Sequence, residues 1–490
     1  MDIIEVHIDS NFSMTQQSPT YSILYVDLDG SLLKTDILWE QCALLLRTPW
    51  KLFGLMFALF KGKLAIKRYC LQHAGLPDIS QLPIRPEVLS IIKDHIQSQI
   101  PVYLATASLE EIAREVQQSI PGINGIIAST NEINAKGEIK AKLIQEHASG
   151  KSFAYIGNNY VDLSIWKHAV GVYYVGTSPS IIRSLLQTHE HVTIIDDKEA
   201  TLSTYIHQIR LYQWIKNSLV FLPAFLAHTL TYDNCSLLFS TFIVFGLMAS
   251  SVYVLNDVLD LHSDRSHPNK KYRPLASGQI SIPVGIFLYS VLFATSLIIS
   301  IAVLPMEVVY VLCAYAFTTT FYSIVGKKIA ILDVMLLAVL YTMRLIAGAE
   351  TVHVPLSQWF MGFSMFFFVS LAFVKRYAEI ISRKDSITVI PGRGYGAGDE
   401  MILLTAGLAS AMLSILVLAL YINSETVVQL YKHPQYLWVL CPVILTWLLQ
   451  LWFLAHRGKM HDDPIITMAR TPMTYIVLSI IVLTVMAATL

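Results

Sequence analysis

The sequence predicts a multidomain protein in which an α/β domain precedes an all-α bundle of nine transmembrane helices. Three observations predict this fold class. Hydrophobic residues make up 54% of the 490 residues and charged residues only 14%, whereas a soluble chain carries about a quarter charged residues. Up to about residue 205, short β-rich runs alternate with helical stretches, which favours a parallel sheet with crossover helices. Beyond that point, long apolar segments follow one another.

The α/β domain is predicted over residues 21–200, after a polar and acidic N-terminus (residues 1–20) that we expect to be disordered. This N-terminus lacks the basic, apolar and cleavage regions of a signal peptide, so the domain is expected to stay in the cytoplasm. The expected strands are residues 21–27, 101–105, 153–156 and 172–175, with a last edge strand within residues 188–204, before the linker.

Residues 52–60 are apolar without interruption and are bracketed by Lys51 and Lys61. As a helix, this segment covers about 14 Å, half of a bilayer core. Two interpretations stay open. The segment is either a buried helix of a cap subdomain, which residues 36–100 would form, or a helix that lies on the membrane surface.

Nine apolar segments define the transmembrane domain, which is predicted over residues 205–490. Each is long enough to cross a bilayer, some of them with interfacial help. They cover residues 213–230, 235–255, 282–303, 307–323, 330–348, 357–374, 401–422, 436–455 and 473–490.

The distribution of basic residues orients these segments. The loops after the second, fourth, sixth and eighth segments hold fourteen Lys and Arg residues, whereas the opposite loops hold Lys432 alone. The positive-inside rule therefore predicts that the N-terminal domain is cytoplasmic and that the C-terminus lies on the outer side. We expect the membrane to be a bacterial inner (plasma) membrane. The balance of 35 basic and 35 acidic residues argues against nucleic acid as a partner.

The strongest chemical signal follows the second apolar segment. Asn256, Asp260 and Asp264 are spaced i, i+4, i+8, and Asp257 lies three residues before Asp260, so their oxygens are predicted along one face of a helix. Such hard oxygen ligands suit Mg²⁺, which completes its shell with substrate phosphate oxygens. A solvated loop of mixed charges is the alternative, but Asp and Asn at the end of an apolar span are costly unless used. Cations for the remaining phosphate charge follow directly: Arg265, His267, Lys270, Lys271 and Arg273.

The spacing Asn-Asp-x-x-Asp-x-x-x-Asp from residue 256 to residue 264 resembles the first motif of the UbiA superfamily of intramembrane prenyltransferases. The resemblance implies a UbiA-like helical bundle that binds Mg²⁺ through Asn256, Asp257, Asp260 and Asp264, with Asp257 and Asp260 as catalytic groups. Diphosphate would then leave from a carbon that can bear positive charge.

A second region of that superfamily is similar to the stretch after the fourth apolar segment. It appears here as Tyr322, followed by Lys327, Lys328 and Asp333. Aromatic prenyltransferases commonly carry a second pair of aspartates there. This chain has Asp333 alone, which counts against an aromatic acceptor.

Six further stretches resemble the decaprenyl-phosphate phosphoribosyltransferase branch of the superfamily. Enzymes of this branch move phosphoribose from phosphoribosyl diphosphate to a polyprenyl phosphate and release diphosphate. The transition states of prenyl and phosphoribosyl transfer both have cationic character, so one metal–diphosphate clamp serves either. The stretches are QWIKN (213–217), HPNKKYRP (267–274), MRLIAGAE (343–350), SQWF (357–360), KRYAE (375–379) and GRGY (392–395).

This branch implies more cations than prenyl transfer, because the donor has a 5-phosphate and the acceptor is itself a phosphate. Ordinary loop charge explains part of a second basic set, which comprises Lys375, Arg376, Arg383, Lys384 and Arg393. Arg344 lies within the fifth segment, where charge is expensive; it could pair with an aspartate or hold a phosphate, and we favour the phosphate. The implied substrate-binding residues are Lys216, Asn217, Lys270, Lys271, Arg273, Tyr322, Lys327, Lys328, Arg344, Lys375 and Arg376.

The N-terminal domain carries a second resemblance. The stretch YVDLDGS, residues 25–31, follows a predicted strand and resembles the first motif of haloacid dehalogenase (HAD)-like phosphatases. The resemblance implies a Rossmannoid fold with a helical cap, Asp27 as the nucleophile that attacks phosphorus, and Asp29 as the general acid and base. Both aspartates would also bind Mg²⁺.

Later positions extend this resemblance. Thr106 ends a strand where the family has a phosphate-binding hydroxyl, and Lys140, or alternatively Lys142, would neutralise the intermediate. The fourth motif, usually GDxxxD, reads GNNYVD, so Asp162 is an implied metal ligand and Asn158 replaces an aspartate. Because the exchange removes a negative charge, either a working phosphatase or a degenerate regulatory or scaffolding domain remains possible.

We therefore predict a phosphoribosyl–polyprenyl phosphate transferase with Mg²⁺ as cofactor and a lipid bilayer as its medium. A fused phosphatase would remove the 5-phosphate from the lipid product. One alternative is a prenyltransferase that uses a polyprenyl diphosphate and an aromatic or quinone-precursor acceptor. Another is a transporter or lipid-binding scaffold, which gives no reason for the aspartates beside clustered cations and would favour inverted repeats, of which we see none.

Overall fold

The computed structural model describes residues 21–196, 200–267, 269–382, 393–460 and 463–490, and the chain divides into two compact units. The first comprises the residues up to Glu199 together with Ser277–Gln279, and the second comprises Ala200–Ala276 and Ile280–Leu490. The boundary between Glu199 and Ala200 falls in the predicted linker. The expected disorder of residues 1–20 lies outside the described residues, as do Arg383 and Lys384 of the second basic set.

The first unit is built on a six-stranded parallel sheet, as the alternation of strands and helices predicts. The strand order is β3-β2-β1-β4-β5-β6, so the direction of the winding reverses at β1. The sequence does not predict β3, whose short run GIIAS has no alternation of apolar and polar residues. The strands are β1 (Ile23–Val26), β2 (Val102–Leu109), β3 (Gly125–Ser129), β4 (Phe153–Gly157), β5 (Gly171–Val175) and β6 (Val192–Ile195).

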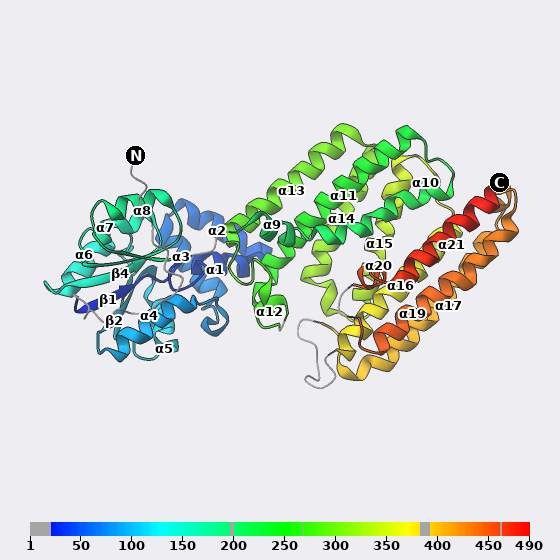
Figure 1. The fold of residues 1–490 in the computed structure, drawn as a ribbon. Coiled ribbons are helices and arrows are strands. Elements are labelled where there is room, and N and C mark those ends of the chain that lie inside the picture. Colours follow the sequence, from blue (N-terminus) through cyan, green and yellow to red (C-terminus); the bar gives the residue numbers. More distant parts are fainter. Residues whose placement is uncertain (1–20, 197–199, 268, 383–392, 461–462) are drawn as a thin grey trace. The chain divides into compact units, whose positions relative to one another are not determined.

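Helices cover both faces of this sheet (Figure 1). Leu24 and Val26 of β1 pack with α4 (Pro86–Gln97) and α5 (Glu110–Ser119), whereas Ile23 and Tyr25 join the core formed with α6 (Glu138–Ala148), α7 (Leu163–Trp166) and α8 (Pro179–Leu186). Successive residues of a strand point to opposite faces, so the continuous apolar run of β1 fills both cores. The unit therefore has three layers, α/β/α.

The segment expected to form the cap divides into two parts. Helices α1 (Ile37–Leu46), α2 (Pro49–Phe60) and α3 (Lys63–Ala74) pack on one another. A short 3-10 turn, η1 (Ile79–Gln81), follows them. By contrast, α4 packs on β2 and belongs to the sheet layer, because its apolar residues meet the sheet. The cap is thus shorter than residues 36–100.

The first of the nine predicted transmembrane segments is not a single α-helix. After α9 (Leu202–Gln208), residues 211–226 form a 3-10 helix, η3 (Leu211–Phe221), and a short α-helix, α10 (Leu222–Leu226). Pro223 lies in the first turn of α10, where a proline has no N–H to continue the helical ladder from the preceding residues. The count of nine spans therefore stays a prediction.

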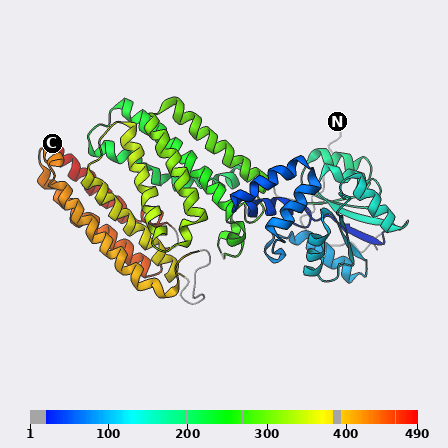
Figure 2. The ribbon, with the colours of Figure 1, turned by 180° about the vertical axis from the view of Figure 1, so that it is seen from behind.

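The described residues contain eight helices that are long and apolar enough to cross a membrane. They correspond to the second to ninth predicted segments. Figures 1 and 2 show them from two sides as one helical bundle. They are α11 (Tyr232–Leu259), α13 (Ile282–Val303), α14 (Met306–Ile324), α15 (Leu332–Thr351), α16 (Gln358–Ile381), α17 (Glu400–Ile422), η7 with α19 (Pro434–His456) and α21 (Pro472–Thr489).

Helix α15 lies at the centre of the membrane unit. It contacts α11, α14, α16, α10 and η3. The contact with η3 is close because residue 348 is glycine: a Cβ at Gly348 would overlap the backbone oxygen of Val220. The η3 segment, which contains Lys216 and Asn217, is thereby held against the part of α15 that contains Arg344.

We expect Gly348→Ala to lower the thermal stability of the protein in detergent, because the added methyl meets a backbone atom rather than a movable side chain. Overpacking of this kind costs about 1–3 kcal/mol. Gly362→Ala in α16 is the matched control, since its Cβ would meet Val417 Cγ1 at 3.4 Å. Equal unfolding temperatures of the two variants would contradict the close contact.

Candidate functional site

The polar residues of the first unit gather at the carboxyl ends of β1, β2 and β4. Asp27 directly follows β1, Thr106 and Ser108 lie near the end of β2, and Asn158 directly follows β4. In an open parallel sheet, ligands bind beyond the carboxyl ends of the strands, where the winding reverses. The topology alone therefore makes this edge a candidate site.

Asp27 lies in a buried ion-pair network. Lys140 Nζ donates to Asp27 Oδ1 at 2.9 Å and lies 3.4 Å from Asp162 Oδ1. Burial raises the pKa of Asp27 to about 7, although Lys140 opposes the shift. Lys142 is exposed, so of the two lysines that the sequence left open, Lys140 is the one that contacts Asp27. The role of Lys140 stays a prediction.

Asp29 is held by neutral donors. Its Oδ1 accepts from the backbone N–H of Ile37 at 2.9 Å, and its Oδ2 accepts from Ser108 Oγ at 2.7 Å. Burial and, to a lesser extent, the neighbouring Asp36 raise the pKa of the Asp29 carboxyl to about 6. Lys67, from the cap helix α3, donates to the backbone oxygen of Ala107 at 2.5 Å and interacts with Asp29. A carboxyl group with a raised pKa can carry the proton that acid catalysis needs.

The other HAD-like positions have local partners. Thr106 Oγ1 is fully buried and accepts from the backbone N–H of Ser108 at 3.0 Å. Asp162 accepts from Tyr155 OH at 3.0 Å and from the backbone of Asn158. A Cβ at Gly30 (φ +77°) would overlap Asn158 Nδ2, so Asn158 closes over the loop that carries the two catalytic candidates.

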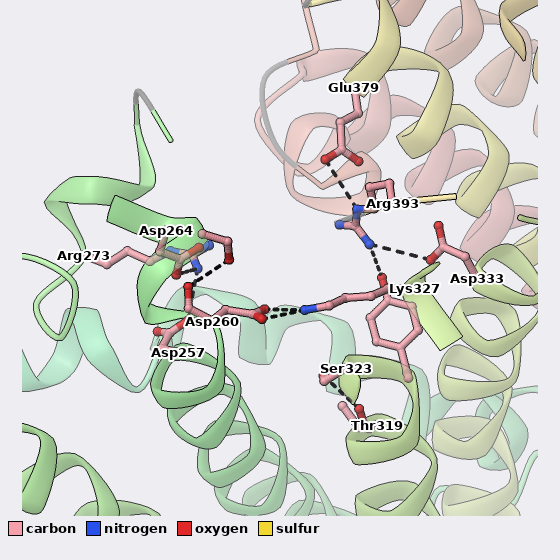
Figure 3. A network of polar contacts seen from close by, with 12 residues as sticks. Asp257, Asp260, Asp264, Arg273, Thr319, Ser323, Lys327, Asp333, Glu379 and Arg393 are labelled. Atoms are coloured by element: carbon pink, nitrogen blue, oxygen red, sulfur yellow. Dashed lines mark hydrogen bonds and ion pairs between the residues drawn. The ribbon is translucent and has the colours of Figure 1, made fainter. Parts of the chain in front are cut away.

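In the second unit, the three aspartates of the motif form ion pairs with arginine and lysine side chains. We call this group the aspartate cluster. Asp257 pairs with Arg210 and, at 3.1 Å, with Arg273 Nη1. The same Arg273 atom lies 2.6 Å from Asp264 Oδ2. Lys327 reaches from the end of α14 to Asp260, at 2.6 and 2.7 Å from its two oxygens (Figure 3).

The helix that carries these aspartates ends within the motif. Asn256 and Asp257 lie in the last turn of α11, Asp260 caps it, and Asp264 lies in the short helix α12 (Leu261–Arg265). Backbone bonds from Asp260 to Asn256 and from Asp264 to Asp260, both 2.8 Å, continue the helical path. The spacing therefore brings the aspartates together as expected, at a helix end rather than along a continuous helix.

The donor set fits Mg²⁺ in chemistry. Within the described part of the chain, no group of three His, Cys, Asp or Glu side chains is arranged as a metal site; the carboxylates face cations instead. Asn256 Oδ1, however, is buried and finds no hydrogen-bond partner among the described residues. A buried acceptor without a donor is costly, and a cation bound there together with the neighbouring carboxylates would satisfy it.

A second group, the Asp333 cluster, joins α15 to α16. Arg376 Nε lies 2.5 Å from Asp333 Oδ2, and Arg376 Nη1 lies 2.6 Å from Glu379. Arg393 lies between Asp333 and Glu379, at 3.8 and 3.7 Å (Figure 3). Tyr322 OH accepts from both arginines, at 2.7 and 2.8 Å. Arg376 is buried within α16, so its charge is not an ordinary loop charge.

A third group is built around Asp463, which the sequence did not single out. Its Oδ2 accepts from Lys216 Nζ at 2.6 Å and from Lys375 Nζ at 3.0 Å, and its Oδ1 accepts from Tyr341 OH at 3.1 Å. Burial raises the pKa of Asp463, but the two lysines outweigh it and hold the pKa well below its usual range. We call these residues, with Arg344, the Asp463 cluster.

Arg344 completes this cluster without a carboxylate of its own among the described residues. Its Nε donates to Asn217 Oδ1 at 3.0 Å, and its Nη2 donates to Tyr315 OH at 3.1 Å. The guanidinium lies 5.1 Å from the centre of the Tyr315 ring and 5.7 Å from that of Tyr341. Among the described residues, Arg344 therefore has no aspartate partner, and the favoured phosphate role stays a prediction.

Of the remaining predicted substrate-binding lysines, one is largely buried and two are exposed. Lys270 is largely buried and interacts with Asp264 and Glu379, which belong to the two neighbouring clusters. Burial lowers its pKa to about 8. Lys271 is exposed and lies over the Tyr272 ring, and Lys328 is also exposed, so the structure does not bring these two lysines to the aspartates.

Sequence reasoning missed several partners that long-range packing supplies. Arg210 and Gln208, both of which contact Asp257, lie 47 and 49 residues before it. Asp463 lies 247 residues after Lys216. One signal was available: Asp463 follows an apolar segment in a basic loop, where an acidic residue has cations nearby.

A family model, two relatives and one solved structure are similar to parts of this chain. The UbiA prenyltransferase family model matches residues 218–469. The protein y4nM of Sinorhizobium fredii is 34% identical over 452 residues, which cover 90% of this chain and 86% of that protein. A decaprenyl-phosphate phosphoribosyltransferase of Mycolicibacterium smegmatis is 35% identical over 184 residues, which cover 36% of this chain and 58% of that enzyme. A solved UbiA homolog from Archaeoglobus fulgidus, bound to GPP and Mg²⁺, has a TM-score of 0.45 at 14% identity and covers 58% of this chain and 99% of that one.

We expect Asp463→Ala to destabilise the protein strongly, because it leaves Lys216 buried, and Lys375 half-buried, without their shared carboxylate. Breaking a buried pair in this way costs about 3–5 kcal/mol. Adding Lys216→Met should recover part of the loss, and thermal unfolding in detergent measures both effects. Asp233→Ala, at the exposed start of α11, is the control; an Asp463→Ala variant as stable as this control would contradict the cluster.

Proposed function

Because this chain belongs to the UbiA prenyltransferase family, we propose that it is an integral membrane transferase that moves 5-phosphoribose from phosphoribosyl diphosphate to a polyprenyl phosphate. Eight long apolar helices support its place in the membrane. The basic loops support an orientation with the N-terminal unit in the cytoplasm. The finer choice of substrates rests on the charges of the membrane unit.

The observation that carries this choice is an excess of positive charge around Asp463. In the described part of the chain, the aspartate and Asp333 clusters together set six basic side chains, Lys270 included, against five carboxylates. Among the described residues, the Asp463 cluster instead sets Lys216, Lys375 and Arg344 against a single carboxylate. Buried charge without a counter-charge is costly, so an anionic ligand group fits there.

Counting phosphates favours the phosphoribosyl reaction. The donor has a diphosphate and a 5-phosphate, and the acceptor is a phosphate, whereas prenyl transfer to an aromatic acceptor involves one diphosphate. In our proposal the aspartate cluster binds the diphosphate, and Lys216, Lys375 and Arg344 bind one of the other two phosphates. The partial similarity to decaprenyl-phosphate phosphoribosyltransferases supports the same choice.

Each group would then have one role in the reaction. Mg²⁺, held by Asn256, Asp257, Asp260 and Asp264, would neutralise the leaving diphosphate. Arg273 and Lys327, released from their carboxylates, would pair with diphosphate oxygens. The acceptor phosphate oxygen attacks the anomeric carbon as the carbon–oxygen bond to diphosphate breaks, and the fixed cations need little reorganisation as this charge develops.

The alternative is prenyl transfer from a polyprenyl diphosphate to an aromatic or quinone-precursor acceptor. Aromatic enzymes would use a second aspartate pair, and the one aspartate available here, Asp333, is already paired with Arg376 and Arg393. This pairing leaves little carboxylate charge for a second metal ion, which favours the phosphoribosyl reaction.

The N-terminal unit supports a second proposal, a Mg²⁺-dependent phosphatase of the HAD type. The observation that favours it is the buried contact of 2.9 Å between Lys140 and Asp27, beside Asp29 held by Ser108. Asp27 would attack phosphorus, Asp29 would protonate the leaving oxygen, and Lys140 would neutralise the intermediate. The transferase product retains a 5-phosphate, which this unit would remove.

For the transferase, we expect purified protein in liposomes to form labelled lipid from radiolabelled phosphoribosyl diphosphate, polyprenyl phosphate and Mg²⁺. Asp257→Ala should lower the rate about 10²–10³-fold, as loss of a charge-stabilising group does, and Asp233→Ala on the same helix should leave it unchanged. EDTA should abolish transfer and Mg²⁺ should restore it. Labelled lipid from an allylic diphosphate and an aromatic acceptor, with none from phosphoribosyl diphosphate, would establish the alternative.

For the phosphatase, we expect the full chain to release phosphate from the phosphoribosyl lipid in the presence of Mg²⁺. Asp27→Asn and Lys140→Met should lower this rate about 10²-fold or more, and the Asp27→Asn protein should accumulate the more acidic lipid. Lys142→Met, on the exposed side of the same helix, is the control. Phosphate release that is equal in Asp27→Asn and wild-type protein would exclude this role.

A further inference from the structure

The outer face of α2 is an apolar surface that neither proposed reaction uses. Trp50, Phe57 and Phe60 are 71%, 72% and 88% exposed. Soluble proteins rarely leave so many large apolar side chains together on one helix. The full set of exposed large apolar residues on α2 is Trp50, Phe53, Met56, Phe57, Leu59 and Phe60.

These side chains form one stripe because of their spacing. At 3.6 residues per turn, positions 50, 53, 57 and 60 lie on one side of the helix. The opposite side packs on α3: Ala58 is buried, a Cβ at Gly54 would overlap the Tyr69 hydroxyl, and Tyr69 OH donates to the backbone oxygen of Lys51 at 2.7 Å. The cap therefore has its own core, and the apolar stripe is not needed for it.

The chain around this helix is basic and has no acidic residue. From residue 41 to residue 77 there is no Asp or Glu, although both occur just outside, at Glu40 and Asp78. A basic amphipathic helix with aromatic residues is typical of a surface that binds anionic lipid. The basic residues of this segment are Arg47, Lys51, Lys61, Lys63, Lys67 and Arg68.

The length of α2 and the linker between the two units limit how α2 can contact lipid. The twelve residues of α2 rise about 18 Å, too short for a bilayer core of about 30 Å. The chain from Ile195, which ends β6, to Leu202, which begins α9, takes seven residue steps and reaches at most about 25 Å. The linker between the two units is thus short.

We infer that α2 lies in the interface of an anionic bilayer, parallel to its surface, with the stripe from Trp50 to Phe60 among the acyl chains near the headgroups. The aromatic side chains gain free energy by leaving water, and the lysines at the helix end lie level with the lipid phosphates. The cap of the first unit is thereby anchored to the membrane surface. This anchoring stands whether or not the unit is a phosphatase.

The test uses the full chain in nanodiscs, with the photoreactive residue p-benzoylphenylalanine in place of Phe57. We expect cross-links to lipid, several-fold more abundant with phosphatidylglycerol than with phosphatidylcholine alone. The same residue in place of Tyr160, which is 64% exposed on the same unit, should give no lipid cross-link. Cross-links from position 57 to a second copy or to another part of this chain, or lipid cross-links equal at positions 57 and 160, would overturn the inference.

Charge variants separate this contact from non-specific insertion. A basic residue near an anionic membrane contributes about 1 kcal/mol, so Lys61→Gln and Lys63→Gln should each lower lipid cross-linking at position 57 about fivefold in anionic nanodiscs. Lys142→Gln, an exposed lysine outside the cap, should leave it unchanged. Equal lipid cross-linking in the Lys61→Gln, Lys63→Gln and Lys142→Gln proteins would show that the two cap lysines do not contribute to lipid binding. It would thereby contradict the inferred orientation of α2.

Discussion

The cost of a charge in an apolar medium is the constraint on which the membrane unit depends. Each buried cation of this unit has a carboxylate or an aromatic ring beside it. These contacts join distant parts of the chain: Arg210 to Asp257, Lys327 to Asp260 and Lys375 to Asp463. The interactions that hold the helices in register are therefore the same ones that gather charge for an anionic substrate.

Helix α15 connects two of these groups. It contributes Asp333 at one end, and Tyr341 and Arg344 two and three turns later. Asp333 is neutralised locally by Arg376, whereas Arg344 is held by Asn217 and aromatic rings. Because Arg344 has no carboxylate partner among the described residues, whereas Asp333 pairs directly with Arg376, the two clusters differ in what they can bind. A phosphate fits the charge of the Asp463 cluster, and a metal–diphosphate fits the aspartate cluster.

The first unit also has buried charges, and its cap contributes a lysine near them. Lys140 offsets Asp27 in a core that raises the pKa of the carboxyl, and the cap helix α3 contributes Lys67 near Asp29. A cap anchored to lipid by α2 would bring such a site to phosphates at the membrane surface. This combination gives a physical reason for one chain to contain both units.

The sequence by itself determined most of the elements, although not β3 or the broken first apolar segment, because the signals of the others are local. The alternation of β-rich and helical runs predicted the parallel sheet, and eight of the nine predicted apolar segments correspond to long helices among the described residues. The spacing of Asn256, Asp260 and Asp264 brought their side chains together at the end of α11. Only the tertiary structure decided the partners. It selected Lys140 over Lys142, exposed the stripe of α2, and joined Lys216 to Asp463 across 247 residues. The reason is that periodicity encodes which face of an element is buried, whereas the partner of a buried charge depends on how distant elements pack.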